Sequence, residues 1–238
     1  MTEWFEEWFG EEYLQLYPHR DFAEAERAVA LILERAGFVP GWRVLDVACG
    51  AGRHARAFEA AGARCVGLDL SAALLRVARG VTGAPLVRAD MRALPVRSRS
   101  MDLTVNLFTS FGYFERDAEH AAALHEMVAT LRPGGWFAID FLNAAAVRAR
   151  LVARETLRVN GTDVRIDRSV SRDGRFVCKT IEGATGRRFT ERVRLFHPGE
   201  IEGMLAAAGV SVRHRFGDYD ASVLAPDSPR TILLGQTA

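Results

Sequence analysis

The sequence predicts an α/β fold built on a doubly wound, mostly parallel sheet. Short apolar runs alternate with helical stretches and tight turns from residue 42 to residue 142, which is the order of parallel strands joined by crossover helices. The apolar runs are nearly continuous, as expected for strands that helices cover on both faces. A glycine-rich turn follows the first run, and in such sheets ligands bind at the carboxyl ends of the strands.

The residues before this pattern are predicted to be helical. Aromatic side chains at positions 4, 5, 8 and 9 recur at near-helical spacing among glutamates, which predicts one amphipathic helix over residues 3–17. Asp21 is placed to cap a second helix that ends near Ala36, before Gly37 and Pro40.

The elements of the main sheet follow in order along the chain. Ser71 is placed to cap the helix after the second strand. The run Pro133-Gly134-Gly135 is expected to end a helix and lead into the fifth strand. Strands are predicted near residues 42–48, 64–68, 85–89, 101–107, 136–141, 210–217 and 230–236, and further helices near 53–61, 117–131 and 198–208.

Residues 154–196 interrupt the alternation of strands and helices. Runs of alternating polarity are separated there by Asn160-Gly161 and Asp173-Gly174, and these dipeptides are typical of tight hairpin turns. We therefore predict an inserted antiparallel β meander within a single domain of residues 1–238. Its hairpins offer edge strands, which can serve as a lid or as a contact in a homodimer.

The composition is that of an ordinary globular protein. Of 238 residues, 49% are hydrophobic and 26% charged, and the formal net charge of +1 indicates no general attraction to nucleic acid or membranes. No apolar run is long enough to span a bilayer, and the N-terminus does not have the form of a signal peptide. Three cysteines without zinc spacing predict no metal site and favour a reducing, cytoplasmic location.

The glycine-rich turn carries the main chemical signal. Gly50 and Gly52 allow a sharp turn and a close approach of the backbone to a ligand. The same glycines fit a short dinucleotide-binding pattern, which is weak evidence in isolation. Asp46 argues against that interpretation, because its carboxylate would repel a pyrophosphate. It suits a ligand that carries a sulfonium and an ammonium group.

Two further carboxylates lie where a nucleoside would bind. Asp69 ends the second strand and can accept hydrogen bonds from both ribose hydroxyls, although nicotinamide-dependent enzymes share this feature. Asp90 follows the third strand and can accept a hydrogen bond from the adenine amino group. Leu70 and Met91 can pack against the two faces of the adenine ring.

Together these segments resemble the motifs of class I S-adenosylmethionine (SAM)-dependent methyltransferases of the small-molecule type. The similarity is carried by LDVACGAGRHARAFEAAGARCVGLDLS, RADMRALPV and LRPGGWFAIDF. It implies a seven-stranded sheet in the order 3-2-1-4-5-7-6 with strand 7 antiparallel, and a cofactor site at Asp46, Gly50, Gly52, Asp69 and Asp90. Ala48 stands where many members have glycine, which is a small change.

The resemblance and the carboxyl edge of the sheet together predict further site residues. Additional contacts to SAM are expected from Ala48, Leu70, Met91, Asn106, Leu107, Tyr17 and Arg20. Candidate substrate contacts are Phe111, Tyr113, Asn143, Asp218, Tyr219 and Arg230, and candidate catalytic groups are Tyr113, Tyr219 and His197. For these aromatic and polar residues, a role in packing or in a turn remains an alternative, and none is identified as a base.

The function expected from the sequence is methyl transfer from SAM to a nitrogen or oxygen of a small molecule, with S-adenosylhomocysteine as product. Residues 1–37 and the meander would form a lid over the reactants. An RNA methyltransferase is one alternative, because arginines gather at positions 148, 150, 154, 187 and 188. A subunit that keeps the fold and binds SAM without turnover is another.

Overall fold

The computed structural model describes residues 3–16, 21–159, 161–182 and 186–238. Its main sheet has seven strands in the order β10-β11-β5-β4-β1-β2-β3, and β11 runs antiparallel to both of its neighbours. The predicted order and the single reversed strand are confirmed. The strands are β1 (Arg43–Val47), β2 (Arg64–Asp69), β3 (Leu86–Arg88), β4 (Met101–Asn106), β5 (Leu131–Leu142), β10 (Val210–Phe216) and β11 (Arg230–Thr237).

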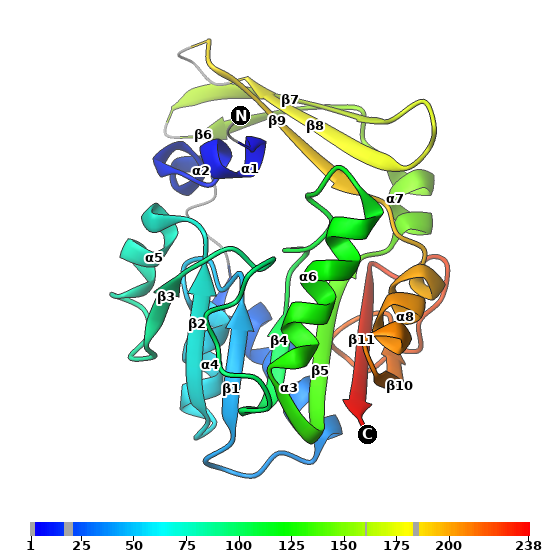
Figure 1. Ribbon diagram of the computed structural model, residues 1–238. Helices are drawn as coiled ribbons and strands as arrows, with labels where there is room; N and C mark the ends of the chain where they lie inside the picture. The colour runs from blue at the N-terminus through cyan, green and yellow to red at the C-terminus, as the bar shows by residue number, and fades with distance from the viewer. Residues whose placement is uncertain (1–2, 17–20, 160, 183–185) are drawn as a thin grey trace.

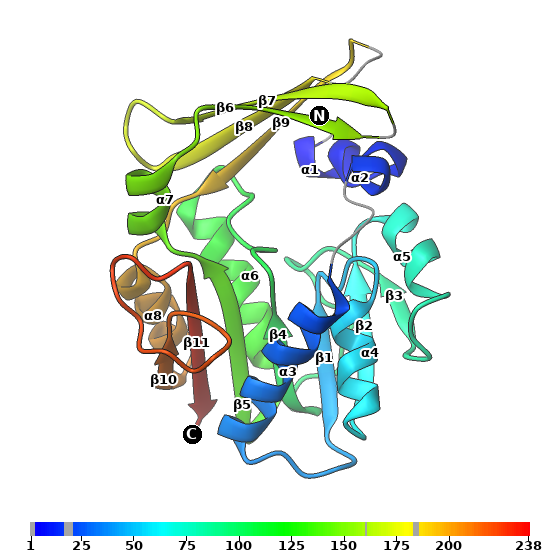
Figure 2. The same ribbon diagram turned by 180° about the vertical axis from the view of Figure 1, so that it is seen from behind.

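Helices cover both faces of this sheet (Figures 1 and 2). On one face α3 (Phe22–Ala36) and α4 (Arg53–Ala60) bury Ile32, Leu33 and Phe58 against β1 and β4. On the other face α6 (Asp117–Ala129) and α8 (Pro198–Ala207) bury Met127 and Leu205 in a second core. The strands between these layers are therefore apolar along almost their whole length, as predicted.

The N-terminal segment forms two short helices where one was predicted. These are α1 (Trp4–Trp8) and α2 (Glu11–Leu16), and the break falls at Phe9 and Gly10. Phe9 has a non-helical backbone, with ψ at 48°, and the Gly10 N–H donates to the carbonyl of Trp8. The turn lets both helices bury aromatic side chains, which a straight helix of this length would direct to only one side.

The insert is the predicted antiparallel meander. Its strands β6 (Arg154–Val159), β7 (Thr162–Val170), β8 (Phe176–Glu182) and β9 (Arg188–Arg194) pair in sequence order. Figure 1 shows this second sheet lying across the carboxyl edge of the main sheet, with α1 and α2 beneath it. Trp8 and Tyr13 pack with Val164, Ile166 and Ile181 in one apolar cluster. The N-terminal helices are thus held between the insert and the strand ends.

Two further helices complete the described elements. Helix α5 (Ala72–Ala78) follows β2 and is capped by Ser71, as predicted. Helix α7 (Ala144–Arg150), which was not predicted, precedes the insert. β5 begins five residues earlier than predicted, because Thr237 Oγ1 and Gln236 Nε2 donate to carbonyls of the Arg132–Gly134 segment and draw it into the sheet. Within the described residues, no helix is both long and apolar enough to cross a membrane.

Candidate functional site

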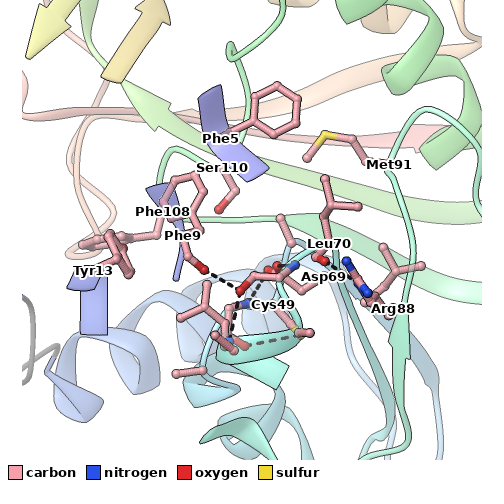
Figure 3. A pocket seen from close by; sticks show the side chains of 18 of the residues that line it. Phe5, Phe9, Tyr13, Cys49, Asp69, Leu70, Arg88, Met91, Phe108 and Ser110 are labelled. Atoms are coloured by element: carbon pink, nitrogen blue, oxygen red, sulfur yellow. Dashed lines mark hydrogen bonds between the residues drawn. The ribbon is translucent and has the colours of Figure 1, made fainter. Parts of the chain in front are cut away.

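A cavity of about 760 Å³ lies at the carboxyl edge of the main sheet, beneath α1 and α2 (Figure 3). Its volume is in the range of sites for cofactors and small ligands. In Figure 3, Asp69, Leu70 and Arg88 lie on one side and Tyr13 on the opposite side. The predicted site residues that line it are Ala48, Gly50, Asp69, Leu70, Asp90, Met91, Leu107, Phe111 and Tyr113.

The glycine loop turns through left-handed backbone conformations. Ala48, Gly50 and Gly52 have φ values of 60°, 55° and 83°. A Cβ added to Gly50 would meet no atom within 4 Å, so the backbone is open to a ligand there. A Cβ on Gly52 would lie 3.0 Å from Thr82 Cγ2 and 3.1 Å from Ala78 Cβ. Gly52 does not line the cavity but allows close packing of α4 on α5, and the contact with SAM predicted for it stays a prediction.

Asp69 is oriented by the backbone on either side of it. The Gly50 N–H donates to Oδ2 and the Ser71 N–H to Oδ1, both at 2.8 Å. Burial raises the pKa of Asp69, while these hydrogen bonds oppose the rise. Each oxygen keeps lone-pair capacity toward the cavity. A ribose with two neighbouring hydroxyls therefore fits this carboxylate.

Asp46 lies behind the lining of the cavity, and the contact with SAM predicted for it stays a prediction. It is fully buried, and its Oδ2 has no hydrogen-bond partner among the described residues. Burial, and then the charge of Asp69, raise its pKa to about 7. Burial, followed by the charges of Asp46 and Asp69, also raises the pKa of Cys49, which does line the cavity. When ionised, these two carboxylates favour a cationic ligand such as SAM over a pyrophosphate.

Asp90 is held by Arg92, which was not among the predicted site residues. Arg92 donates from Nε to both oxygens of Asp90 and from Nη2 to Oδ2 at 2.6 Å. Although burial raises the pKa of Asp90, these hydrogen bonds lower it below its usual value. Arg92 also lies 3.4 Å from Glu3, just before α1. The carboxylate expected at the adenine end is thus tied to the N-terminal segment.

The loop after β4 forms the other wall of the cavity. Phe108, Ser110, Phe111 and Tyr113 all line it. The hydroxyl of Tyr113 donates to the Thr109 carbonyl at 2.7 Å, which orients this ring but does not identify it as a base. We call residues 108–113 the acceptor wall, because the sequence predicts contacts with a methyl acceptor for Phe111 and Tyr113 in this loop.

Aromatic residues of the N-terminal helices complete the lining, and none of them was among the predicted site residues. Phe5, Phe9 and Tyr13 line the cavity, and Phe9 lies 5.6 Å from Tyr113 between ring centroids. The Trp4 indole donates to the Tyr113 carbonyl at 3.3 Å. The only signal for them was the aromatic spacing, which predicts a buried helix face but not what that face covers.

Several predicted site residues lie elsewhere, each for a structural reason. Asn106 is buried and donates to the Val47 carbonyl, which joins β4 to β1. Asn143 caps α7 and donates to the Ala225 carbonyl. His197 caps α8 by accepting from the Gly199 N–H. Asp218 accepts from the Tyr219 N–H within its own turn. None of the four lines the cavity.

Tyr219 and Arg230 also lie behind the lining and not in it. Both donate to Asp140, the tyrosine from its hydroxyl at 2.6 Å and the arginine from Nε at 2.5 Å. Burial, and then the charge of Asp140, raise the pKa of Tyr219, so it is not a base at ordinary pH. Tyr17 and Arg20 lie outside the described residues. Within those residues, no group of three or more acidic, histidine or cysteine side chains could hold a metal.

Comparison with known proteins identifies the family. A model described as a methyltransferase domain matches residues 44–135. The chain is 31% identical to the dTDP-3-amino-3,4,6-trideoxy-alpha-D-glucopyranose N,N-dimethyltransferase of Streptomyces venezuelae. The match extends over 217 residues, which are 83% of this chain and 87% of that relative. The chain belongs to the class I SAM-dependent methyltransferases. It is an enzyme of the small-molecule type, and SAM is its methyl donor.

Solved structures agree with the assignment of this chain to the methyltransferases. The sugar N-methyltransferase KedS8 from Streptoalloteichus sp ATCC 53650 is 30% identical, with a TM-score of 0.70 over 96% of this chain and 93% of that one. The CcbJ methyltransferase from Streptomyces caelestis has a TM-score of 0.80 over 97% and 98% of the two chains. At 18% identity, the second similarity shows the fold alone.

Proposed function

We propose that this methyltransferase transfers the methyl group of SAM to a nitrogen atom of a small-molecule amine. SAM supplies a methyl group that is already activated by its sulfonium. In this assignment Asp69 binds the ribose hydroxyls, the Gly50 backbone lies against the cofactor, and Leu70 and Met91 flank the adenine. The acceptor wall then lies at the methyl end of the cofactor.

The choice of nitrogen is carried by the chemistry of that end of the cavity. Phe5, Phe9, Phe108, Ser110 and Tyr113 line it, and these side chains are apolar or hydroxyl-bearing. The exposed carboxylate of Glu6 also lines this end, where it can attract a cationic amine. The one imidazole in the described lining is His54, which is buried at the start of α4 beside the glycine loop. An amine attacks through its own lone pair, whereas a hydroxyl requires a proton acceptor. This wall therefore suits an amine.

The relatives support the same acceptor atom. Two of them, from Streptomyces venezuelae and Streptomyces fradiae, are N,N-dimethyltransferases of amino sugars carried on dTDP. The ubiquinone biosynthesis O-methyltransferase of Bordetella bronchiseptica matches over only 47% of each chain. We propose amino sugars as the first class of acceptor to examine.

The chain contributes alignment and exclusion of water more than acid or base catalysis. We assign both tasks to a lid made of the N-terminal helices and the insert. The Trp8 indole donates to Glu191 of β9 at 2.6 Å, which joins the two parts of the lid. The other face of the insert carries cross-strand ion pairs, such as Arg154–Asp167 at 3.2 Å and Arg165–Glu182 at 3.7 Å. A charged outer face favours the lid role over an apolar dimer contact.

The RNA alternative is less well supported. Arg148 donates to the Gly174 carbonyl at 2.8 Å, and Arg154 pairs with Asp167, so these charges have local partners. We infer that a small amine and not a nucleic acid is the partner. We also place the enzyme in the cytoplasm, because its three cysteines are free thiols.

The test has a binding arm and a turnover arm. Calorimetric titration should show saturable binding of SAM and S-adenosylhomocysteine and none of NAD. With a nucleotide-linked amino sugar, the enzyme should form S-adenosylhomocysteine and the N-methylated product. The matched control replaces the amino group by a hydroxyl and should give no product. Methylation of the hydroxyl analogue alone would overturn the assignment to nitrogen.

A further inference from the structure

We propose that Asp140 is a positioning residue for methyl transfer, because its carboxylate and its carbonyl fix Phe108 and Thr109, where the acceptor wall begins. Asp140 lies near the carboxyl end of β5, does not line the cavity and is fully buried. It acts through Phe108 and is not itself a catalytic residue. The inference rests on the proposed function, which places the transferred methyl group beside this wall.

The carboxylate of Asp140 binds donors from three separate segments. Arg230 of β11 donates from Nε to Oδ1 at 2.5 Å and from Nη2 to Oδ2 at 2.9 Å. Tyr219 donates its hydroxyl to Oδ2 at 2.6 Å. The backbone N–H of Phe108 donates to the same oxygen at 2.9 Å. A buried carboxylate with this many donors is held in one orientation.

The backbone that Asp140 holds is in an uncommon conformation. Phe108 and Thr109 have φ values of 59° and 60°, in the left-handed region that side chains with a Cβ disfavour. The Phe108 N–H binds the Asp140 carboxylate, and the Thr109 N–H donates to the Asp140 carbonyl at 2.9 Å. One residue of β5 therefore stabilises both strained residues, a pattern typical of functional sites.

The side chain of Phe108 is fixed by the same cluster. The guanidinium carbon of Arg230 lies 4.9 Å from the ring centroid of Phe108, and that of Arg53 lies 4.0 Å from it. Arg53 belongs to the first turn of α4 and pairs with Glu24 of α3 at 3.2 Å. The ring is thus held between the glycine-loop helix and the β5–β11 pair.

Through Thr109, Asp140 also affects the position of Tyr113 in the acceptor wall. Tyr113 donates its hydroxyl to the carbonyl of Thr109, so the position of that carbonyl sets the position of the tyrosine ring. If Asp140 loses its charge, the left-handed turn relaxes and Phe108 and Tyr113 shift together. The ribose site at Asp69 belongs to β2 and is hydrogen-bonded to Gly50 and Ser71, so it stays intact.

The main test is Asp140→Asn, which keeps the shape and removes the charge. We expect kcat for the amine to fall about 100-fold, the effect of a misplacement near 1 Å, with KM and the S-adenosylhomocysteine dissociation constant changed less than about threefold. SAM and S-adenosylhomocysteine differ at the methyl group and its charge. Their affinity ratio reports on the wall without any acceptor, and we expect it to move toward unity.

A matched control is an aspartate–arginine pair that also involves strand β5. Asp102 of β4 pairs with Arg132 of β5 at 2.5 Å, at the opposite, amino edge of the sheet. Asp102→Asn also breaks an aspartate–arginine pair and should lower thermal stability without changing kcat or the affinity ratio. If Asp140→Asn loses no more activity than this control, the positioning role is wrong. Equal losses in S-adenosylhomocysteine binding and kcat would also overturn it, since they indicate collapse of the whole site.

If Asp140→Asn does not fold, Tyr219→Phe tests the positioning role of Asp140 instead. It removes a single hydrogen bond to Asp140 and keeps the ion pair with Arg230, so we expect kcat to fall about threefold. An unchanged kcat together with an unchanged affinity ratio would contradict the proposal. If the wild type methylates no amine, the proposed function fails, but the affinity ratio of these variants still tests the positioning of the wall.

Discussion

The two ends of the cavity are built from different kinds of interaction. At the end that we assign to the cofactor, Asp69 is oriented by N–H groups of Gly50 and Ser71, close to it in the sheet or in the chain. At the acceptor end, Phe108 and Tyr113 are held by Asp140 and Trp4, from distant parts of the chain. The first end is a property of one motif and the second a property of the whole fold. The cofactor site should therefore tolerate changes that disable the acceptor wall.

The largest expected effect is a loss of SAM affinity when the cofactor end alone is changed. Asp69→Ala removes two charge-assisted hydrogen bonds to the ribose, so we expect SAM to bind about 4 kcal/mol more weakly, or roughly a thousandfold. Calorimetry measures this loss. Asp167→Ala, on the insert, is the control and should bind SAM normally. Unchanged affinity in Asp69→Ala would remove the distinction between the two ends.

The next effect concerns the charge behind the glycine loop. Burial, and then Asp69, raise the pKa of Asp46 from 3.8 to about 7, so the folded protein keeps a proton that the unfolded chain releases. The stability from this protonation is present below about pH 4 and is lost as the pH rises through about 7, with a magnitude on the order of 4 kcal/mol.

Denaturant unfolding of the ligand-free protein at about pH 5 and about pH 8 checks this dependence. Asp46→Asn should reduce the difference in the free energy of unfolding between the two conditions. A difference as large as that of the wild type would show that Asp46 is not the group that titrates.

A smaller effect is expected where the N-terminal helices of the lid join the insert. Trp8→Phe keeps an aromatic ring but removes the indole hydrogen bond to Glu191, so we expect SAM to dissociate about fivefold faster, as for the loss of one such bond. Stopped-flow displacement measures the rate. Trp42→Phe is the matched control, because Trp42 packs on Phe38 near the start of β1. The same rate in both variants would argue against a lid.

The smallest effect should appear at the acceptor end. Glu6 is an exposed carboxylate that lines the cavity from α1. Because solvent screens it, Glu6→Gln should raise KM for a cationic amine by no more than about threefold and leave SAM affinity unchanged. Steady-state kinetics with amines of different charge measures this. A large change in SAM affinity would mean that Glu6 belongs to the cofactor end.

The difference between the ends also explains what the sequence could predict. The order of the main sheet, the lining positions of Gly50 and Asp69, and the hairpin at Asp173-Gly174 follow from local patterns and from the family resemblance. Gly174, for example, adopts the positive φ of 72° that its turn requires. Such features depend on a few neighbouring residues and on the rules for parallel strands.

The acceptor end could not be predicted in the same way. Tyr219 and Arg230 do lie near the carboxyl edge, but their side chains turn toward Asp140, and only the packed structure shows that direction. Asn143 caps α7, a helix that was not predicted, whereas His197 caps α8, which begins where the sequence predicts a helix. Phe5 and Phe9 reach the cavity through contacts between α1 and the loop after β4, which residue spacing alone does not reveal.

The most direct measurement is to locate the donor methyl group in the bound state. SAM labelled with carbon-13 in its methyl group can be titrated into the wild type and into Phe108→Leu, and its contacts followed by nuclear Overhauser effects. Our account predicts contacts between the methyl protons and the rings of Phe108 and Tyr113, with a methyl resonance that shifts in the variant. Bound SAM whose methyl group shows no contact to either ring would contradict the assignment of the two ends.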